Sequence, residues 1–151
     1  MFLLFDSTHN IKNVFNSFEK RREFSFPSHE LLSATCADYG HIEELCEFED
    51  NKALKVAYKL PPNVLHPTSV ERVSTKHALS IFCESTESGL RFYSESISKP
   101  WAETASFVGL VTKYWKILNV KTPTKGEHKT DYNQGPITSS FDHKLLFLRQ
   151  I

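Results

Sequence analysis

The sequence predicts a mainly helical fold, in which a helical domain follows one strand and one helix of an α/β core. Through several segments, apolar residues recur at three- and four-residue intervals, the spacing of amphipathic helices. The continuous apolar run at residues 2–5 is the one convincing strand pattern, and residues 55–58 are the nearest second candidate. A strand buried on both faces needs neighbours, so we expect residues 1–22 to border a larger core.

Composition and charge narrow the class of protein. With 151 residues, the chain is long enough for one domain with its own core. Eighteen Lys and Arg balance eighteen Asp and Glu, so any contact with nucleic acid must come from a local patch. Three cysteines without CxxC spacing argue against a disulfide framework or a zinc site. No stretch approaches the roughly 18 apolar residues of a membrane span, so we expect a soluble intracellular protein with no membrane partner.

The first helix follows the strand directly and ends near residue 22. Its apolar stripe consists of Ile11, Val14, Phe15 and Phe18. Asp6 lies at the carboxyl end of the strand, where open α/β sheets place catalytic or ligand-binding groups. The alternative is that Asp6 caps the helix. Lys12, near the positive end of this helix, is either a phosphate contact or a solvated side chain.

The middle of the chain is divided by capping residues and prolines. We expect a short helix from Ser28 to Gly40 and a second over residues 42–48. Prolines hold residues 59–68 in extended or turn conformation. A longer helix then starts at Ser74 or Thr75, continues past residue 90, and ends at Lys99 and Pro100.

The last third contains the clearest helix, over residues 107–118. Residues 120–138 contain two glycines and two prolines without periodicity, which predicts a long polar loop. Ser139 or Ser140 caps a final helix that includes Leu145, Leu146 and Leu148.

Few residues indicate a binding chemistry by themselves. No P-loop is present, so a nucleotide would have to be held by other contacts. Candidate contacts to phosphate or base are Lys55, Lys59, Arg72, Lys76 and His77; Asp50 and Asn51 are candidates for reading a purine edge, or are turn residues. The loop cations Lys121, Lys125, His128 and Lys129 either contact DNA phosphates or are solvated. The aromatic residues Trp101, Phe107, Tyr114 and Trp115 either stack on a base or form core.

Three segments, in order, resemble the P-element-type DNA transposases, including their THAP-linked members. Residues 5–16 resemble the family's F-D-x-x-H-x-x-K-x-x-x-N segment, with Asn10 where the family usually has Leu. Residues 57–60, His66 and residues 76–82 resemble its KL…H…A-x-x-x-x-S region, with Cys83 where Ser is usual. The stretch from residue 107 to 120, which ends W-K-I-L-N-V, and residues 136–148 resemble its F…W-x-I-L-N region.

The resemblance implies an RNase H-like catalytic core, with a helical GTP-binding domain inserted into it. Residues 1–25 would then be the end of the core, and residues 26–151 the insertion domain, truncated at its C-terminus. GTP would serve as an assembly cofactor that is not hydrolysed, and Mg²⁺ would act in the core of the parent enzyme. The expected nucleotide contacts are Lys12, Asp50, Asn51, Lys59, Arg72, Lys76 and Asn119.

The same resemblance implies a nuclear protein that meets transposon DNA through the full-length enzyme and forms a homo-oligomer. Asp6 is the one candidate catalytic residue and metal ligand in the chain, and the remaining carboxylates are expected outside it. Two-metal phosphoryl transfer needs the full carboxylate set, so the chain alone should not cut or join DNA. The alternative hypothesis is a domesticated or degenerate helical protein-interaction module without nucleotide binding.

Overall fold

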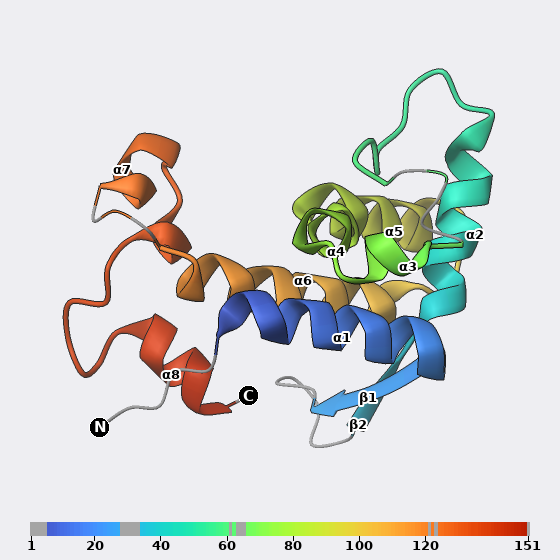
Figure 1. Ribbon diagram of the computed structural model, residues 1–151. Helices are drawn as coiled ribbons and strands as arrows, with labels where there is room; N and C mark the ends of the chain where they lie inside the picture. Colours follow the sequence, from blue (N-terminus) through green and yellow to red (C-terminus); the bar gives the residue numbers. More distant parts are fainter. Residues whose placement is uncertain are drawn as a thin grey trace. The chain divides into compact units, whose positions relative to one another are not determined.

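The structure, a computed structural model, describes residues 6–27, 34–60, 62, 66–120, 122 and 124–150. Its contacts divide the chain into two compact units, Met1–Val111 and Thr112–Ile151. Helices dominate, which confirms the predicted fold class (Figure 1). The predicted strand at residues 2–5 and the predicted cap Ser28 lie outside the described residues.

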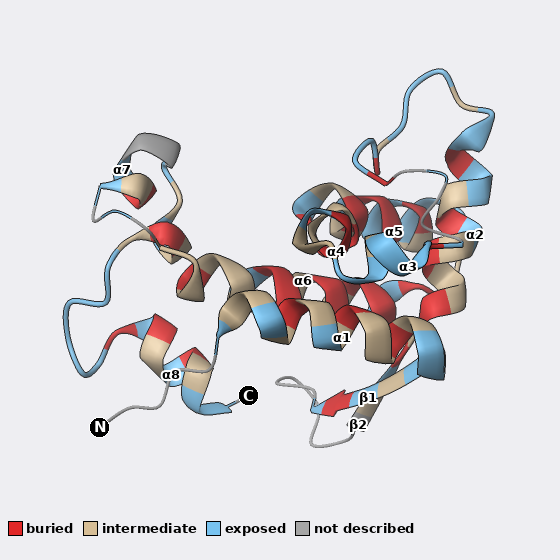
Figure 2. Ribbon diagram, in the orientation of Figure 1, coloured by how far each residue is buried: buried red, intermediate tan, exposed pale blue. Residues whose placement is uncertain are grey.

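Helix α1, Ser7–Arg21, forms where the apolar stripe predicted it. Asp6 is its N-cap and accepts a hydrogen bond from the backbone N–H of Thr8 at 2.9 Å. Ile11, Phe15 and Phe18 are buried along one side of the helix (Figure 2). Arg22 ends the helix with a φ of 68°, and its backbone N–H donates to the carbonyl of Phe18.

A β-hairpin follows α1, which corrects the prediction that these residues contain no strand. Strands β1, Glu23–Pro27, and β2, Ala34–Asp38, pair antiparallel with Phe24 opposite Ala37. The sequence EFSFP does alternate, but two aromatic residues in a five-residue run give a weak strand signal.

Helix α2, Tyr39–Asp50, includes the helix predicted over residues 42–48. Asp38 caps it by accepting from the N–H of Gly40 at 2.7 Å. Gly40 therefore lies in the first turn of a helix, and the prediction that it closes one was wrong. A glycine with negative φ is compatible with a helix start, so its presence did not identify a terminus.

Three helices follow the proline-containing segment. Helix α3, Ser69–Arg72, begins at a capping box formed by Thr68 and Glu71. Ser74 caps α4, Thr75–Ile81, as predicted. The single long helix predicted here is two helices, because the chain turns at Phe82 and Cys83 before α5, Glu84–Ser96.

Helix α6, Ala102–Leu118, extends the clearest predicted helix at its N-terminus and runs through the boundary between the two units. Phe107 is the aromatic centre of the first unit, with ring centroids 4.9–6.1 Å from the rings of Phe18, Phe24, Phe26 and Phe82. Trp101 and Phe107 are buried, so the core alternative is confirmed for both residues.

The second unit contains short helices where a long loop was predicted. Helix α7, Lys125–Lys129, and the 3-10 helix η2, Tyr132–Gln134, lie within residues 120–138. Helix α8, His143–Gln150, forms as expected, but Asp142 caps it by accepting from the N–H of Lys144 at 2.9 Å. The predicted caps, Ser139 and Ser140, lie in the preceding turn.

Candidate functional site

Three of the predicted nucleotide contacts lie on helices that pack together. Lys12 is on α1, Arg72 ends α3, and Lys76 is the second residue of α4; each pair of these helices is in contact. Residues 12, 16 and 19 form one stripe on α1, and the latter two, Asn16 and Glu19, reach α3. Lys12 therefore lies one turn before Asn16, on the face of α1 that meets α3. We call this region the α1–α3–α4 junction.

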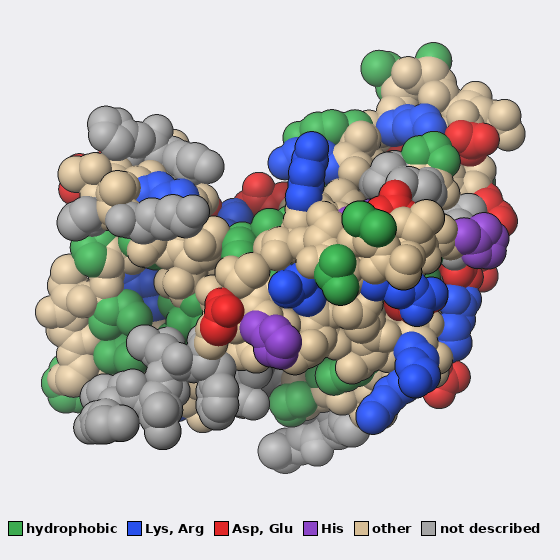
Figure 3. All heavy atoms as spheres, in the orientation of Figure 1, with side chains coloured by type: hydrophobic (Ala, Val, Ile, Leu, Met, Phe, Trp, Pro, Cys, Tyr) green, Lys and Arg blue, Asp and Glu red, His purple; other side chains and the backbone are tan. Residues whose placement is uncertain are grey.

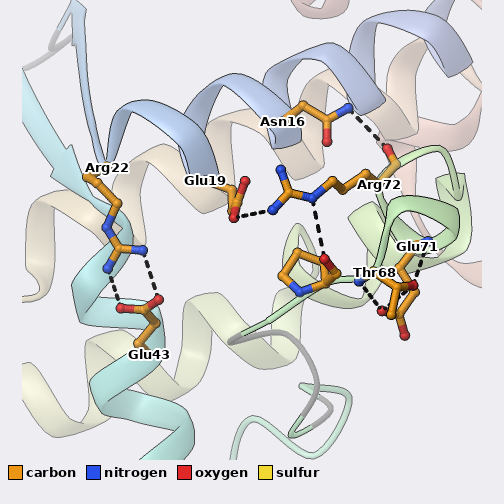
Figure 4. Close-up of polar contacts among 8 residues, drawn as sticks. Asn16, Glu19, Arg22, Glu43, Thr68, Glu71 and Arg72 are labelled. Carbon is orange, nitrogen blue, oxygen red and sulfur yellow. Dashed lines mark hydrogen bonds and ion pairs between the residues drawn. The ribbon is translucent and has the colours of Figure 1, made fainter.

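Arg72 is the polar centre of the junction (Figure 4). Its guanidinium donates to Glu19 Oε1 at 3.0 Å and to the carbonyl of Pro67 at 3.4 Å. Its own carbonyl accepts from the side-chain amide of Asn16 at 3.0 Å. The Arg72 side chain is 44% exposed, and its guanidinium has donors beyond these two contacts, so it remains available to an anion.

Two buried polar atoms at the junction have no hydrogen-bond partner among the described residues. They are Asn16 Oδ1 and His77 Nε2. His77 packs edge-on against Phe15, with ring centroids 5.3 Å apart. Burial lowers the pKa of His77, and the negative charge of Glu71, which raises it, offsets only part of this effect. The ring is therefore neutral near pH 7. Buried polar groups nearly always have partners, so a polar ligand or water fits this place.

The face of the molecule that carries the junction also carries cationic side chains. Lys and Arg gather over α1 and α3 on the visible face (Figure 3). Lys76 is exposed and Lys12 partly exposed. The arrangement can attract an anion and meet it with a guanidinium and ammonium groups.

Three other predicted contacts, Asp50, Asn51 and Lys59, lie at the end of α2 and in the loop that follows. Asp50 ends α2, and its carboxylate is 3.6 Å from Lys55 Nζ. Asn51 is the C-cap of the helix. Lys59 is exposed, 5.8 Å from the Tyr58 ring centroid. No described contact joins these residues to Lys12, Arg72 or Lys76. Residues 56–59 form a turn, so residues 55–58 are not the candidate strand.

Glu49, which the sequence analysis missed, holds this loop in place. It is 2% exposed, and its carboxylate accepts from the backbone N–H groups of Val56 at 2.8 Å and Ala57 at 3.0 Å. Tyr93 on α5 donates its hydroxyl to the same carboxylate at 3.1 Å. The available signal was the spacing of Ile42, Leu45 and Glu49 at i, i+3 and i+7, which places a carboxylate on the apolar stripe of α2.

A cation lies over aromatic rings beside this anchor. Lys52 Nζ is 3.8 Å from the ring centroid of Phe48 and 4.3 Å from that of Tyr93. Burial, together with the hydrogen bond to Glu49, raises the pKa of Tyr93, so its hydroxyl stays protonated and continues to donate. These contacts therefore hold the loop in place. The role of Asp50 and Asn51 in reading a purine edge remains a prediction.

Asn119, the last predicted nucleotide contact, belongs to the second unit. It follows α6, and its carbonyl accepts from Lys125 Nζ at 3.0 Å. Of the predicted loop cations, Lys121 and the side chains of His128 and Lys129 lie outside the described residues. Tyr114 and Trp115 are partly exposed, so their role remains a prediction.

Asp6 is the cap of α1, which agrees with one of its two interpretations. Its role as a catalytic residue or metal ligand remains a prediction. In the part of the chain that the structure describes, no group of three or more His, Cys, Asp or Glu side chains could hold a metal ion. None of the described helices is long and apolar enough to cross a membrane.

Comparison with known proteins identifies the family. The family profile described as the TNP-like, GTP-binding insertion domain matches residues 8–131. The match spans α1 to α7 and includes every residue predicted to contact nucleotide. Searches of curated proteins and of solved structures gave no match. Because the matched region is most of the chain, this protein belongs to the TNP-like GTP-binding insertion domain family.

Proposed function

We propose that this chain binds GTP as the insertion domain of a P-element-like DNA transposase, with the α1–α3–α4 junction as the phosphate-binding part of the site. The observation that carries the proposal is the family match over residues 8–131. The packing of Lys12, Arg72 and Lys76 on contacting helices supports the location. A nucleoside triphosphate needs several cationic groups, because its phosphates carry up to four negative charges.

Each group at the junction has a role in this proposal. The ammonium groups of Lys12 and Lys76 contribute point charges, which tolerate movement of the phosphate chain. The guanidinium of Arg72, already oriented by Glu19 and Pro67, donates to phosphate oxygens in a fixed direction. The Asn16 Oδ1 atom, which has no partner among the described residues, accepts a hydrogen bond from the nucleotide or from a water molecule beside it. Asp50, Asn51 and Lys59 remain proposed contacts to other parts of the nucleotide, and the predicted role of Asn119 in the second unit stays a separate prediction.

The wider role is that of the parent enzyme. We propose that bound GTP supports assembly with transposon DNA in the nucleus, in a homo-oligomer. Mg²⁺ and the catalytic carboxylates would act in the RNase H-like core, of which residues 1–25 are the proposed end. No metal-ligand cluster occurs among the described residues.

Titration with a fluorescent GTP analogue, with and without Mg²⁺, tests the proposal. Unlabelled GTP should displace the probe, and ATP should compete less well. Lys12→Ala and Lys76→Ala should each weaken binding by about tenfold, the effect of one charge-assisted hydrogen bond. Lys20→Ala, which removes an exposed charge from the last turn of α1, is the matched control and should bind normally. If the parent protein and the three variants bound GTP with equal affinity, the phosphate-binding site would have to lie elsewhere.

A further inference from the structure

The loop that follows α2 has a lysine held against two aromatic rings. Lys52 Nζ lies over the ring of Phe48, 3.8 Å from its centroid, and over the ring of Tyr93, 4.3 Å from its centroid. The two rings meet edge to face, with centroids 4.9 Å apart and an interplanar angle of 74°. Phe48 belongs to α2 and Tyr93 to α5, so one ammonium group joins the start of the loop to two helices. We call Lys52 and these two rings the lysine corner.

The lysine corner depends on positive charge and not on hydrogen bonding. Within the described part of the chain, the Lys52 ammonium contacts ring faces, whereas the Lys55 ammonium in the same loop pairs with the Asp50 carboxylate at 3.6 Å. A ring face attracts a cation through its quadrupole, and it does so equally when the nitrogen carries methyl groups, as in the aromatic cages that bind methylated lysine. A change that removes the charge abolishes the attraction. The lysine corner therefore distinguishes the chemical states of one side chain.

Tyr93 links the lysine corner to the hydrogen bonds that hold the loop. Its hydroxyl donates to the buried carboxylate of Glu49 at 3.1 Å, while Lys52 covers its ring. The same carboxylate accepts from the backbone N–H groups of Val56 at 2.8 Å and Ala57 at 3.0 Å. The loop rises beyond the end of α2 and is fastened at its base by these contacts (Figure 1). Loss of the lysine corner should therefore let the loop open more often and expose the two N–H groups to water.

We propose that Lys52 is a modification site, at which the charge of the side chain determines how firmly the loop is held. Acetylation removes the charge and releases the loop, and methylation keeps the charge and leaves the loop in place. In the first reaction the neutral amine attacks an acetyl thioester; the C–N bond forms, the C–S bond breaks, and the thiolate takes up the proton that the nitrogen loses. In the second the amine attacks the methyl group of a sulfonium donor; the C–S bond breaks to leave a thioether, and the nitrogen proton passes to water.

The Lys52 amine can react when the loop opens, because its side chain is already partly exposed. A cation over a ring face shifts an equilibrium between closed and open loop by roughly twofold to thirtyfold, which is too little to keep the amine permanently in the corner. Through Lys59, which the same loop carries, release of the loop also affects GTP binding, a consequence that rests on the proposed function. Incubation of the folded chain with an acetyl thioester, followed by peptide mass spectrometry, should show acetylation of Lys52. A chain that becomes acetylated at Lys55 and never at Lys52 would contradict this accessibility.

Hydrogen exchange of the full chain without nucleotide tests the effect on the loop, with acetyl-lysine or trimethyl-lysine installed at position 52. The amides of Val56 and Ala57 report it, because their N–H groups bond to Glu49. Acetyl-lysine should accelerate their exchange about fivefold or more, within the range of one cation–π contact. Trimethyl-lysine should leave their exchange as slow as in the unmodified chain, or slower. Acetyl-lysine at position 55 is the matched control, because it removes an exposed ion pair from the same loop and should change the exchange by less than about twofold.

A ring variant tests whether the aromatic faces are the cause. Phe48 is 37% exposed, so Phe48→Leu should leave the fold intact, and in this variant acetylation of Lys52 should accelerate the exchange less than in the parent chain. Equal exchange in the acetylated and unmodified chains, an equally fast exchange with trimethyl-lysine and acetyl-lysine, or an undiminished effect of acetylation in Phe48→Leu would each overturn the inference. No nucleotide is present in these measurements, so their outcome is independent of whether the chain binds GTP.

Discussion

The buried carboxylate of Glu49 on α2 accepts the hydroxyl hydrogen bond of Tyr93 on α5 at 3.1 Å. The same carboxylate accepts from the backbone N–H groups of Val56 and Ala57, so one side chain joins two helices and the loop that follows α2. The loop that it holds carries Lys55 and Lys59. A residue without any proposed ligand role therefore holds the loop that carries Lys59, a proposed nucleotide contact.

We expect Glu49→Ala to destabilise the protein by about 3 kcal/mol, because it leaves two buried N–H groups and a buried hydroxyl without an acceptor. Tyr93→Phe removes one donor and should cost about 1 kcal/mol. Urea denaturation measures both changes in the free energy of unfolding. Glu47→Ala, at an exposed position on the same helix, is the control and should change the free energy by under about 0.5 kcal/mol. A Glu49→Ala effect as small as this would contradict the anchoring role.

His77 makes stability depend on pH. Burial lowers its pKa in the folded state, so the unfolded chain binds the proton more readily. Stability contributed by the neutral ring is fully present above the unfolded pKa of about 6.5, and is lost as pH falls from there toward the lower folded value. The loss continues as pH falls and stops below the folded pKa, where both states bind the proton. Denaturation at pH 7.5, 6.5 and 5.5 should give a shallower pH dependence for His77→Gln; identical dependence would contradict this origin.

The buried ion pair of Asp142 and Lys144 should stabilise the fold of the second unit. Their side chains are 3% and 2% exposed, so Asp142→Ala leaves a buried ammonium group without its counter-ion and should destabilise this unit. The double variant Asp142→Ala with Lys144→Met should recover part of that loss, because it removes the stranded charge. Hydrogen exchange of the amides of residues 132–150 reports the change locally. If the double variant exchanges faster than Asp142→Ala, charge burial is not the cause.

Much of the helical structure follows from the sequence. Local signals in the sequence predicted the apolar stripes of α1 and α6 and the helix caps Asp6 and Ser74. They were sufficient because these features depend on residues close together in the chain. The hairpin was missed because its pairing joins residues up to 15 positions apart, Glu23 and Asp38, and depends on tertiary contacts. The division between α4 and α5 was missed because apolar spacing continues across Phe82 and Cys83.

The site was predicted less completely than the fold. Basic residues near the proline-containing segment were singled out by type, and three of the predicted contacts lie on packed helices at one junction. Glu49 and Asn16 were missed because their importance lies in what they contact across the fold, Ala57 and Arg72, which spacing along the chain does not reveal. The contact of Lys52 with the ring of Tyr93 was likewise hidden, since the two residues are far apart in the sequence.

The most direct test of the account is calorimetric titration of the folded chain with GTP, beside the same titration with the Lys12→Ala, Lys76→Ala double variant. We predict saturable binding with one site, weakened about a hundredfold in the double variant, because each lost charge-assisted contact costs about a factor of ten. Circular dichroism of both proteins confirms that the helices are intact. A folded chain that releases no heat and shows no saturation with GTP would contradict the central claim.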